Sequence, residues 1–484
     1  MVVLVLVFNK SYLKTTLLYT LFNLLIFFTM LNTLGNHFSR NIIIIALFTS
    51  IQFIFNIFCY RQVGIKMLSL TGVFTLLNYI FHLGQPFIKL VAPNYIFAFD
   101  VSKFLTQSTY LESLIYSSIT IMAVSGGAML FRSGCTKKVA KTSFLDSADV
   151  ILQENNLFKV GSYIFAFTFP LELYLTINRI ITALQSGYLD TFGVELGGLP
   201  SFLATFSIVG VVLMIFGSRS NIQRGWTIYA LYVAFYLMAM FSGGRMWQII
   251  KILIVTMYFV KTYNIKFTKK HIFWMIIAAY FGSGFLAAIA DFRSYDFSSS
   301  SFIGEAIRNV FENNPILGVL DEFGGTVYTV GLVIEQVPSH LDFSWGRQFI
   351  TGFVELLPNI SSRITRLASE ANYVIQLKVP TIGGSFIGEM YYSFHYFGII
   401  FAFFVGMLAQ FITEKIDEGI MKRDYSFIVY SLLFQYSFIS WVRGSSPTFY
   451  RNTVYSLILL YFINNIVFSN KETIFSNKAI KNSR

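Results

Sequence analysis

Four arginines stand where an apolar stretch ends or where a loop is expected to turn. Arginine makes planar, two-pronged contacts with phosphate and carboxylate groups, which lysine cannot make. Ser242-Gly243-Gly244 precedes the first of them, and its glycines would let the backbone approach a ligand closely. The alternatives are anchoring to lipid headgroups and a simple hairpin turn with a snorkelling side chain. The diphosphate-binding candidates are Arg245, Arg293, Arg347 and Arg443.

Three residues could act as a general base: Glu389, Glu322 and His340. Glu389 follows Gly383-Gly384-Ser385 and lies near the start of an apolar run. A carboxylate inside a membrane costs about 2.5–3.5 kcal/mol, so Glu389 should face a cavity or a partner. The alternative interpretations place Glu389 in the membrane interface and make Glu322 a solvated acid.

Several kinds of chemistry lack their usual signature. The chain has no phosphate-binding glycine loop, no His/Cys cluster with metal-ligand spacing and no Ser/His/Asp signature. We therefore predict an activity that needs neither a metal nor a cofactor. The net charge of +12 could indicate nucleic-acid binding. The basic residues lie in short links between apolar runs, however, which favours membrane topology and no nucleic-acid partner.

The composition predicts an all-α, polytopic membrane protein. Of the 484 residues, 55% are hydrophobic and 12% are charged, against about 25% charged in soluble proteins. Apolar runs of roughly 20 residues indicate helical spans. Lys251 and Glu172 fall inside such runs and could pair or line a cavity. We predict twelve spans, at residues 15–34, 41–60, 66–84, 109–131, 159–179, 199–217, 226–242, 246–260, 271–290, 386–411, 426–442 and 453–468.

The distribution of basic residues orients these spans. The links after every even-numbered span are basic and mostly lysine, and so are both ends of the chain. Cytoplasmic links carry such an excess, so we predict that both termini are cytoplasmic. The basic residues of the outer links are mostly arginine.

One outer link, at residues 291–385, is much longer than the rest. We expect it to form short helices at 302–313, 317–337 and 348–357, the second of them apolar enough to lie in the membrane interface or dip into it. It therefore reads as a lid over the outer ends of the spans. We predict that residues 1–484 form a single membrane domain with this long periplasmic loop inside it.

With these features the chain resembles the O-antigen (oligosaccharide repeat unit) polymerases of the Wzy type. The resemblance covers nearly the whole length: about twelve spans, cytoplasmic ends and one large late loop. Its local matches are residues 242–245, 322–326, 345–358 and 383–398. The chain departs from a two-loop arrangement, since its early outer link, residues 85–108, is only of modest length.

The resemblance implies a multi-pass protein of the bacterial inner membrane that acts on lipid-linked sugars. A growing glycan would move from undecaprenyl pyrophosphate to the terminal sugar hydroxyl of an incoming repeat unit. The arginines would stabilise the leaving pyrophosphate, and a carboxylate or imidazole would accept the proton. Implied partners are undecaprenyl-pyrophosphate-linked oligosaccharide, membrane lipids and a chain-length regulator. The alternatives are an O-antigen ligase and a flippase or transporter of lipid-linked oligosaccharide.

Overall fold

The computed structural model describes residues 9–134, 147–186, 189–194, 200–284, 314–356, 383–422 and 425–461, apart from single positions and pairs within 200–284 and 425–461. Its elements in these ranges are all helical. The chain divides into two compact units. The first contains residues 1–140, 316–417 and 437–451, and the second contains the remainder. Each unit is described separately.

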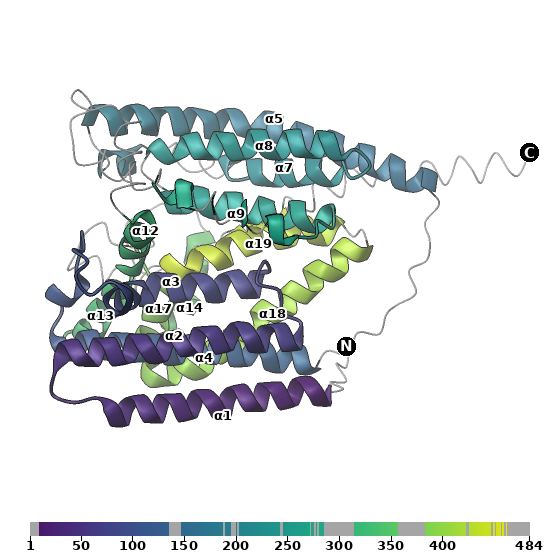
Figure 1. The fold of residues 1–484 in the computed structure, drawn as a ribbon. Coiled ribbons are helices and arrows are strands. Elements are labelled where there is room, and N and C mark those ends of the chain that lie inside the picture. The colour runs from purple at the N-terminus through teal and green to yellow at the C-terminus, as the bar shows by residue number, and fades with distance from the viewer. Residues whose placement is uncertain are drawn as a thin grey trace, which may run out of the picture. The chain divides into compact units, whose positions relative to one another are not determined.

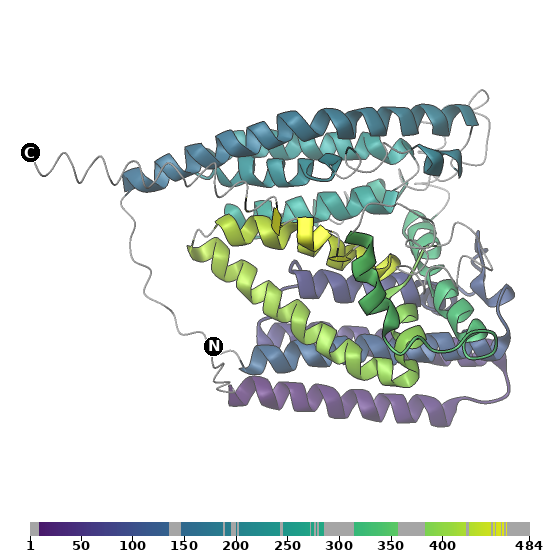
Figure 2. The same cartoon turned by 180° about the vertical axis from the view of Figure 1, so that it is seen from behind.

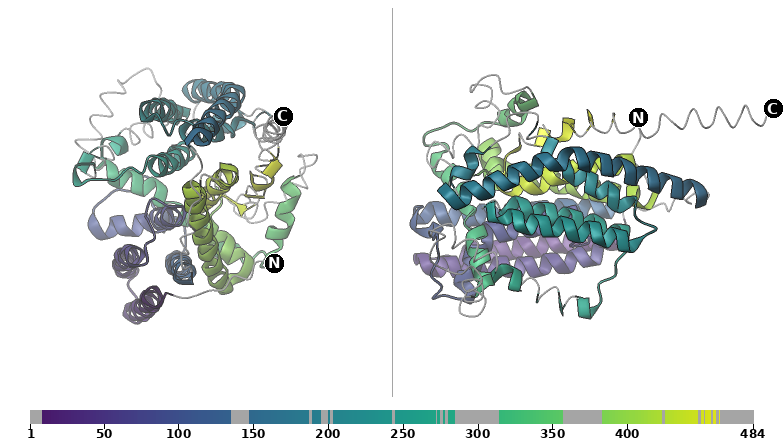
Figure 3. Two further views of the ribbon diagram at one scale, coloured as in Figure 1. Left: turned by 90° about the vertical axis from the view of Figure 1, so that its right-hand side faces the viewer. Right: turned by 90° about the horizontal axis from the view of Figure 1, so that it is seen from above.

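The first unit is built on four long helices that pack against one another: α1 (Lys10–Thr33), α2 (Phe38–Val63), α3 (Leu70–Val91) and α4 (Gln107–Gly134). Figure 1 shows α1, α2 and α4 lying side by side, and the left view of Figure 3 shows the bundle nearly end-on. Shorter elements complete the unit: η1 (Val101–Lys103), α12 (Pro315–Gly324), α13 (Val327–Gln336), α14 (Arg347–Thr351), η4 (Gly352–Leu356), α17 (Phe386–Phe394), η5 (His395–Phe397), α18 (Gly398–Lys422, as far as residue 417) and η6 (Trp441–Arg443).

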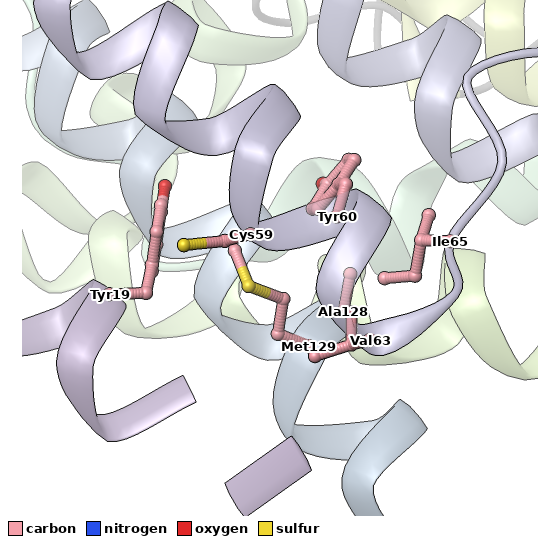
Figure 4. Close-up of a cluster of buried hydrophobic side chains, with 7 residues drawn as sticks. All are labelled: Tyr19, Cys59, Tyr60, Val63, Ile65, Ala128 and Met129. Atoms are coloured by element: carbon pink, nitrogen blue, oxygen red, sulfur yellow. The ribbon is translucent and has the colours of Figure 1, made fainter. Parts of the chain in front are cut away.

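A compact core joins α1, α2 and α4 at one end of these helices. Tyr19, Cys59 and Met129 meet there, together with Tyr60, Val63, Ile65 and Ala128 (Figure 4). In a lipid surround, apolar burial contributes little to helix association, so close packing and polar contacts must hold the helices together. Such contacts are present, since Asn56 donates to Ser125 Oγ over 2.7 Å between α2 and α4.

Two glycines fix the contact between α4 and α18. A Cβ added at Gly127 would overlap the carbonyl of Phe403, and one added at Gly406 would overlap the carbonyl of Val124. Small residues at such positions let two helix backbones touch directly. Figure 2 shows α18 inclined to α1, α2 and α4. The two helices therefore meet at one crossing with a defined register.

The second unit surrounds a buried ion pair. Its described helices are α5 (Ser147–Ser186), η2 (Leu189–Gly193), α7 (Ser207–Phe216), α8 (Ile222–Ala239), η3 (Met240–Ser242), α9 (Arg245–Thr262) and α19 (Tyr425–Ser440, as far as residue 436). Lys251 Nζ of α9 lies 2.5 Å from Glu172 Oε1 of α5. Tyr236 and Ser207 donate to the same carboxylate. The two charges predicted to fall inside spans are therefore paired.

Seven described segments are long and apolar enough to cross a membrane. Six coincide with predicted spans: Lys10–Thr33, Phe38–Val63, Gln107–Gly134, Glu154–Ser186, Ile222–Ser242 and Phe386–Met421. The chain is thus a multi-pass helical membrane protein, while the count of twelve stays a prediction. The run predicted at 199–217 differs, because its helix α7 has only ten residues and rises ~15 Å. Residues 203–204 are helical, and residues 205–206 form a turn ahead of it.

The seventh segment, Pro315–Gln336, lies inside the predicted loop. It consists of α12 and α13, which form where an interfacial or dipping segment was expected. The expected helix at 348–357 forms as α14 and η4. The expected helix at 302–313 lies outside the described residues. The predicted span at 386–411 is interrupted, because His395 has a φ of 52° and ends α17 before α18 begins.

Candidate functional site

The helix that carries Glu389 begins at a buried and doubly bonded cap. Ser385 has extended backbone angles, and its hydroxyl accepts a bond of 3.4 Å from the Gly388 N–H. Its Oγ also lies 2.7 Å from His82 Nε2 of α3. The other ring nitrogen of His82 lies 3.1 Å from the Asn78 carbonyl, which can only accept. In the neutral ring, Nδ1 therefore carries the proton and Nε2 accepts from Ser385.

The Glu389 carboxylate is buried and surrounded by donors. Its residue is 2% exposed. Trp441 Nε1 donates to one oxygen over 2.6 Å, and the Ser446 N–H lies 3.0 Å from both oxygens. Ser446 Oγ lies 3.4 Å from the other oxygen. The buried acid thus has the partners that its burial requires.

Arg443 lies within the segment that grips Glu389. Trp441 and Ser446, which donate to the carboxylate, stand on either side of it in the chain. Gly383 approaches the same segment, since a Cβ added there would lie 3.1 Å from the Arg443 carbonyl. The Gly-Gly-Ser run before α17 therefore passes close to the backbone of Arg443. The backbone of one predicted phosphate ligand therefore lies close to the run that leads into the helix of one predicted base.

Hydrogen bonds from α14 also hold α17, the helix that carries Glu389. Gln348 is buried and donates to Ser393 Oγ and, over 3.5 Å, to the Glu389 carbonyl. Ser393 donates to that carbonyl over 2.5 Å. Arg347 precedes Gln348 and is exposed at the start of α14. The structure therefore places Arg347 in the unit that holds Glu389, on a short helix bonded to α17.

Asp321, the neighbour of the predicted base Glu322, ties α12 to its surroundings. Asp321 is 3% exposed. It accepts from Gln85 Nε2 over 2.9 Å and from the Ala98 N–H over 2.8 Å. Glu322 is only half-buried. The sequence does not distinguish two adjacent acids on one helix, whereas in the structure it is Asp321 that bonds to Gln85 of α3.

Electrostatic effects outside the spans agree with this arrangement. Burial, with the negative charge of Glu389 as the second cause, raises the pKa of Tyr450 to about 12. Burial, followed by the charge of Asp321, raises the pKa of Tyr95 to about 12. Burial alone would raise the pKa of Asp100, but hydrogen bonds from Ser102 and the Lys89 ammonium hold it below its ordinary value.

The remaining predicted residues do not join this cluster by any described contact. His340 is exposed in the turn after α13, and its N–H donates to the Gln336 carbonyl. Arg245 begins α9 in the second unit and is 3% exposed. Arg293 lies outside the described residues. The predicted convergence of several arginines on one pyrophosphate thus stays a prediction.

Three residues of the site were not singled out from the sequence: His82, Trp441 and Ser446. The signal for His82 was available, since a histidine inside an apolar run needs a polar partner. Trp441 lies two residues before Arg443 in the sequence, and Ser446 lies three residues after it. Their role depends on a long-range contact with Glu389, which spacing along the chain does not reveal.

No group of three or more His, Cys, Asp or Glu side chains that could hold a metal occurs among the described residues. This leaves the prediction of metal independence untested.

Comparison with known protein families gives one match. The family model described as "O-antigen polysaccharide polymerase Wzy" matches residues 2–472, nearly the whole chain. Comparisons with curated proteins and with solved structures find no match.

Proposed function

Because the chain belongs to the O-antigen polysaccharide polymerase family Wzy, we propose that it joins lipid-linked repeat units with Glu389 as base and Arg443 as phosphate ligand. The donor would be a glycan on undecaprenyl pyrophosphate, and the reaction would occur at the periplasmic face of the inner membrane. The acceptor would be the terminal sugar hydroxyl of an incoming repeat unit.

The proposed transfer step balances without any further reactant. The acceptor hydroxyl oxygen forms a bond to the anomeric carbon of the donor glycan. The bond from that carbon to the pyrophosphate oxygen breaks, and the pyrophosphate leaves with the electron pair. The hydroxyl proton passes to the carboxylate of Glu389. The cation of Arg443 stabilises the negative charge that develops on the leaving group.

The observation that carries this proposal is that residues on both sides of Arg443 in the chain donate hydrogen bonds to Glu389. Trp441 and Ser446 donate to the carboxylate from either side of the arginine. The segment that carries Arg443 thus also binds Glu389, which supports a site that combines a base with a phosphate ligand. Arg347, on the helix bonded to α17, is a second proposed phosphate ligand.

Gene deletion distinguishes this function from its two relatives. Loss of a polymerase should leave lipopolysaccharide core capped with a single repeat unit. Loss of a ligase would leave bare core while polymer accumulates on the lipid carrier, and loss of a flippase would leave no surface glycan. Lipopolysaccharide gels read all three outcomes, and only single-unit capping is compatible with the proposal.

The arginines are tested by substitution in the complemented deletion strain. Arg245 and Arg293 keep their predicted role as pyrophosphate ligands. Alanine at either should abolish long chains while the protein still inserts. Lysine should restore them only in part, because the two-pronged geometry is lost. Near-normal ladders from both alanine variants would remove these two residues from the proposal.

A further inference from the structure

A group of aromatic rings gathers beside a carboxylate where α17 ends. The rings belong to Phe343, Trp345, Tyr391, His395 and Tyr396, which we call the aromatic platform. Phe343 lies 5.0 Å from His395 and 5.9 Å from Trp345 between ring centroids. His395 lies 4.5 Å from Tyr396 and 5.2 Å from Tyr391. The five rings therefore form one continuous contact network.

The polar centre of the platform is Glu112 of α4. Tyr396 donates to its Oε1 over 2.9 Å, and Tyr391 donates over 3.3 Å. Glu112 is half-buried. Anchoring in the membrane interface would use the aromatic rings, but it assigns no role to a carboxylate that two of the tyrosines hold. A carboxylate among aromatic faces instead suits a ligand that has both hydroxyl groups and apolar faces.

Two residues of the platform have backbone conformations that residues other than glycine rarely adopt. Trp345 has a φ of 47°, and His395 has a φ of 52°. Among the described residues only Asn264 shares this property outside glycine. Bulky residues held in such conformations cluster at ligand sites, where the surrounding structure must enforce them. Both residues belong to the aromatic platform, although they are far apart in the chain.

Part of the platform is open to a ligand. Trp345 is 66% exposed, and Tyr396 is 42% exposed. The face of an aromatic ring is electron-rich, so it attracts the polarised C–H groups on one face of a sugar ring. The Glu112 carboxylate can accept hydrogen bonds from sugar hydroxyls. Rings for orientation and a few polar groups for specificity are the usual composition of a small-ligand site.

The platform is joined to Glu389 through the backbone. Glu389 and His395 are six residues apart, so a helix would separate them by ~9 Å. The Ser344 N–H donates to the Tyr392 carbonyl over 3.0 Å, which fixes the Trp345 turn against α17. A ligand on the platform would therefore lie within a few ångströms of the helix that carries the proposed base.

We propose that the aromatic platform and Glu112 form a glycan-binding subsite, which orients the sugar chain of a lipid-linked substrate. The proposal rests on the proposed function for the identity of the glycan. The rings stack on the apolar faces of successive sugars, and Glu112 accepts from their hydroxyl groups. It assigns a use to Trp345 and to His395, which have no other role in the transfer step.

The test is glycan binding by the full-length protein in lipid nanodiscs. The probe is the free repeat-unit oligosaccharide of the host strain, which carries no lipid or phosphate. Trp345→Ala and Glu112→Gln should each raise the Kd for the oligosaccharide by about tenfold, as expected for one lost stacking or hydrogen-bonding partner. Trp345→Phe should restore much of the affinity. Trp274→Ala, which removes another exposed tryptophan, should leave the Kd unchanged.

The outcomes separate this proposal from the proposed function. Glu389→Gln should bind the oligosaccharide normally while it fails to polymerise. If Trp345→Ala and Glu112→Gln lower the melting temperature or the amount inserted but leave the Kd unchanged, the platform is a membrane-interface anchor and the proposal is wrong. Single-unit capping on gene deletion together with unchanged Kd values would overturn the subsite alone. Raised Kd values in these two variants, together with a ligase phenotype on gene deletion, would overturn the polymerase function alone.

Discussion

Replacing Glu389 with glutamine tests whether its carboxylate takes part in chemistry or only holds the fold together. The amide oxygen can take the place of the oxygen that receives Trp441 Nε1 at 2.6 Å and the Ser446 N–H at 3.0 Å. The amide NH₂ then takes the place of the other oxygen, within reach of Ser446 Oγ. Trp441 Nε1 and the Ser446 N–H each keep an acceptor in this arrangement, while the Ser446 hydroxyl loses the oxygen to which it donates.

The expected cost in stability follows from the two bonds that lose their charge. Hydrogen bonds to a charged group contribute about 1.5–3 kcal/mol, and neutral ones contribute about 0.5–1.5 kcal/mol. Over two donors, Glu389→Gln should lower the free energy of unfolding by about 2 kcal/mol. Loss of a general base should lower the rate of transfer by about 10²–10⁴-fold. Activity should therefore fall far more than stability.

Trp441→Phe is the matched control. It removes one donor to Glu389, which should cost about 1.5–3 kcal/mol, but it keeps an aromatic ring close to Phe386. The assay pairs thermal unfolding of the purified protein with lipopolysaccharide ladders from the complemented deletion strain. Trp441→Phe should match Glu389→Gln in melting temperature and still make long chains.

Two results would refute this reasoning. Long chains from Glu389→Gln would show that the carboxylate is not the base. Equal loss of polymer in both variants, in proportion to their melting temperatures, would show that Glu389 acts only by bracing α17 against residues 441–446.

Three further expectations concern the surroundings of Glu389. Arg443→Ala should abolish long chains and Arg443→Lys should restore them in part, which ladders would show; a normal ladder from alanine would contradict the phosphate role. His82→Ala should cost about 1–3 kcal/mol, because it leaves the buried Ser385 hydroxyl without its acceptor, and in unfolding measurements the double variant with Ser385→Ala should cost less than the sum; strict additivity would disprove the contact. Asp100 has a lowered pKa in the folded protein, so its bonds stabilise the 92–106 loop at neutral pH and are lost as the pH falls below about 3.8; limited proteolysis should show this loss in the native chain and not in Asp100→Asn.

The membrane class and much of the helix layout could be predicted from the sequence, because apolar runs reflect a constraint that acts locally. Each residue of a run must suit the bilayer whatever its neighbours in space are. The short helix α7 and the break at His395 were missed for the opposite reason. Both runs are apolar on average, and mean hydropathy cannot tell a continuous helix from an interrupted one.

The site was predictable only in part. Glu389 could be identified because an acid in an apolar run must find partners, but which partners it finds depends on packing. Trp441 and Ser446 lie more than fifty residues from it in the chain. The distinction between Asp321 and Glu322 likewise depends on which side of α12 faces Gln85, and that is a property of the assembled bundle.

The glycine contact between α4 and α18 sets the position of these two helices along each other, and thereby the geometry of the aromatic platform. A side chain at Gly127 or Gly406 would overlap the backbone of the opposing helix, so the observed alignment places a glycine at each point of close approach. Glu112 lies on α4, and Tyr396 lies just ahead of α18. A slip of one helical turn would move the tyrosine ~5.4 Å from the carboxylate. The alignment of ring and acid is therefore set by two residues that touch neither of them.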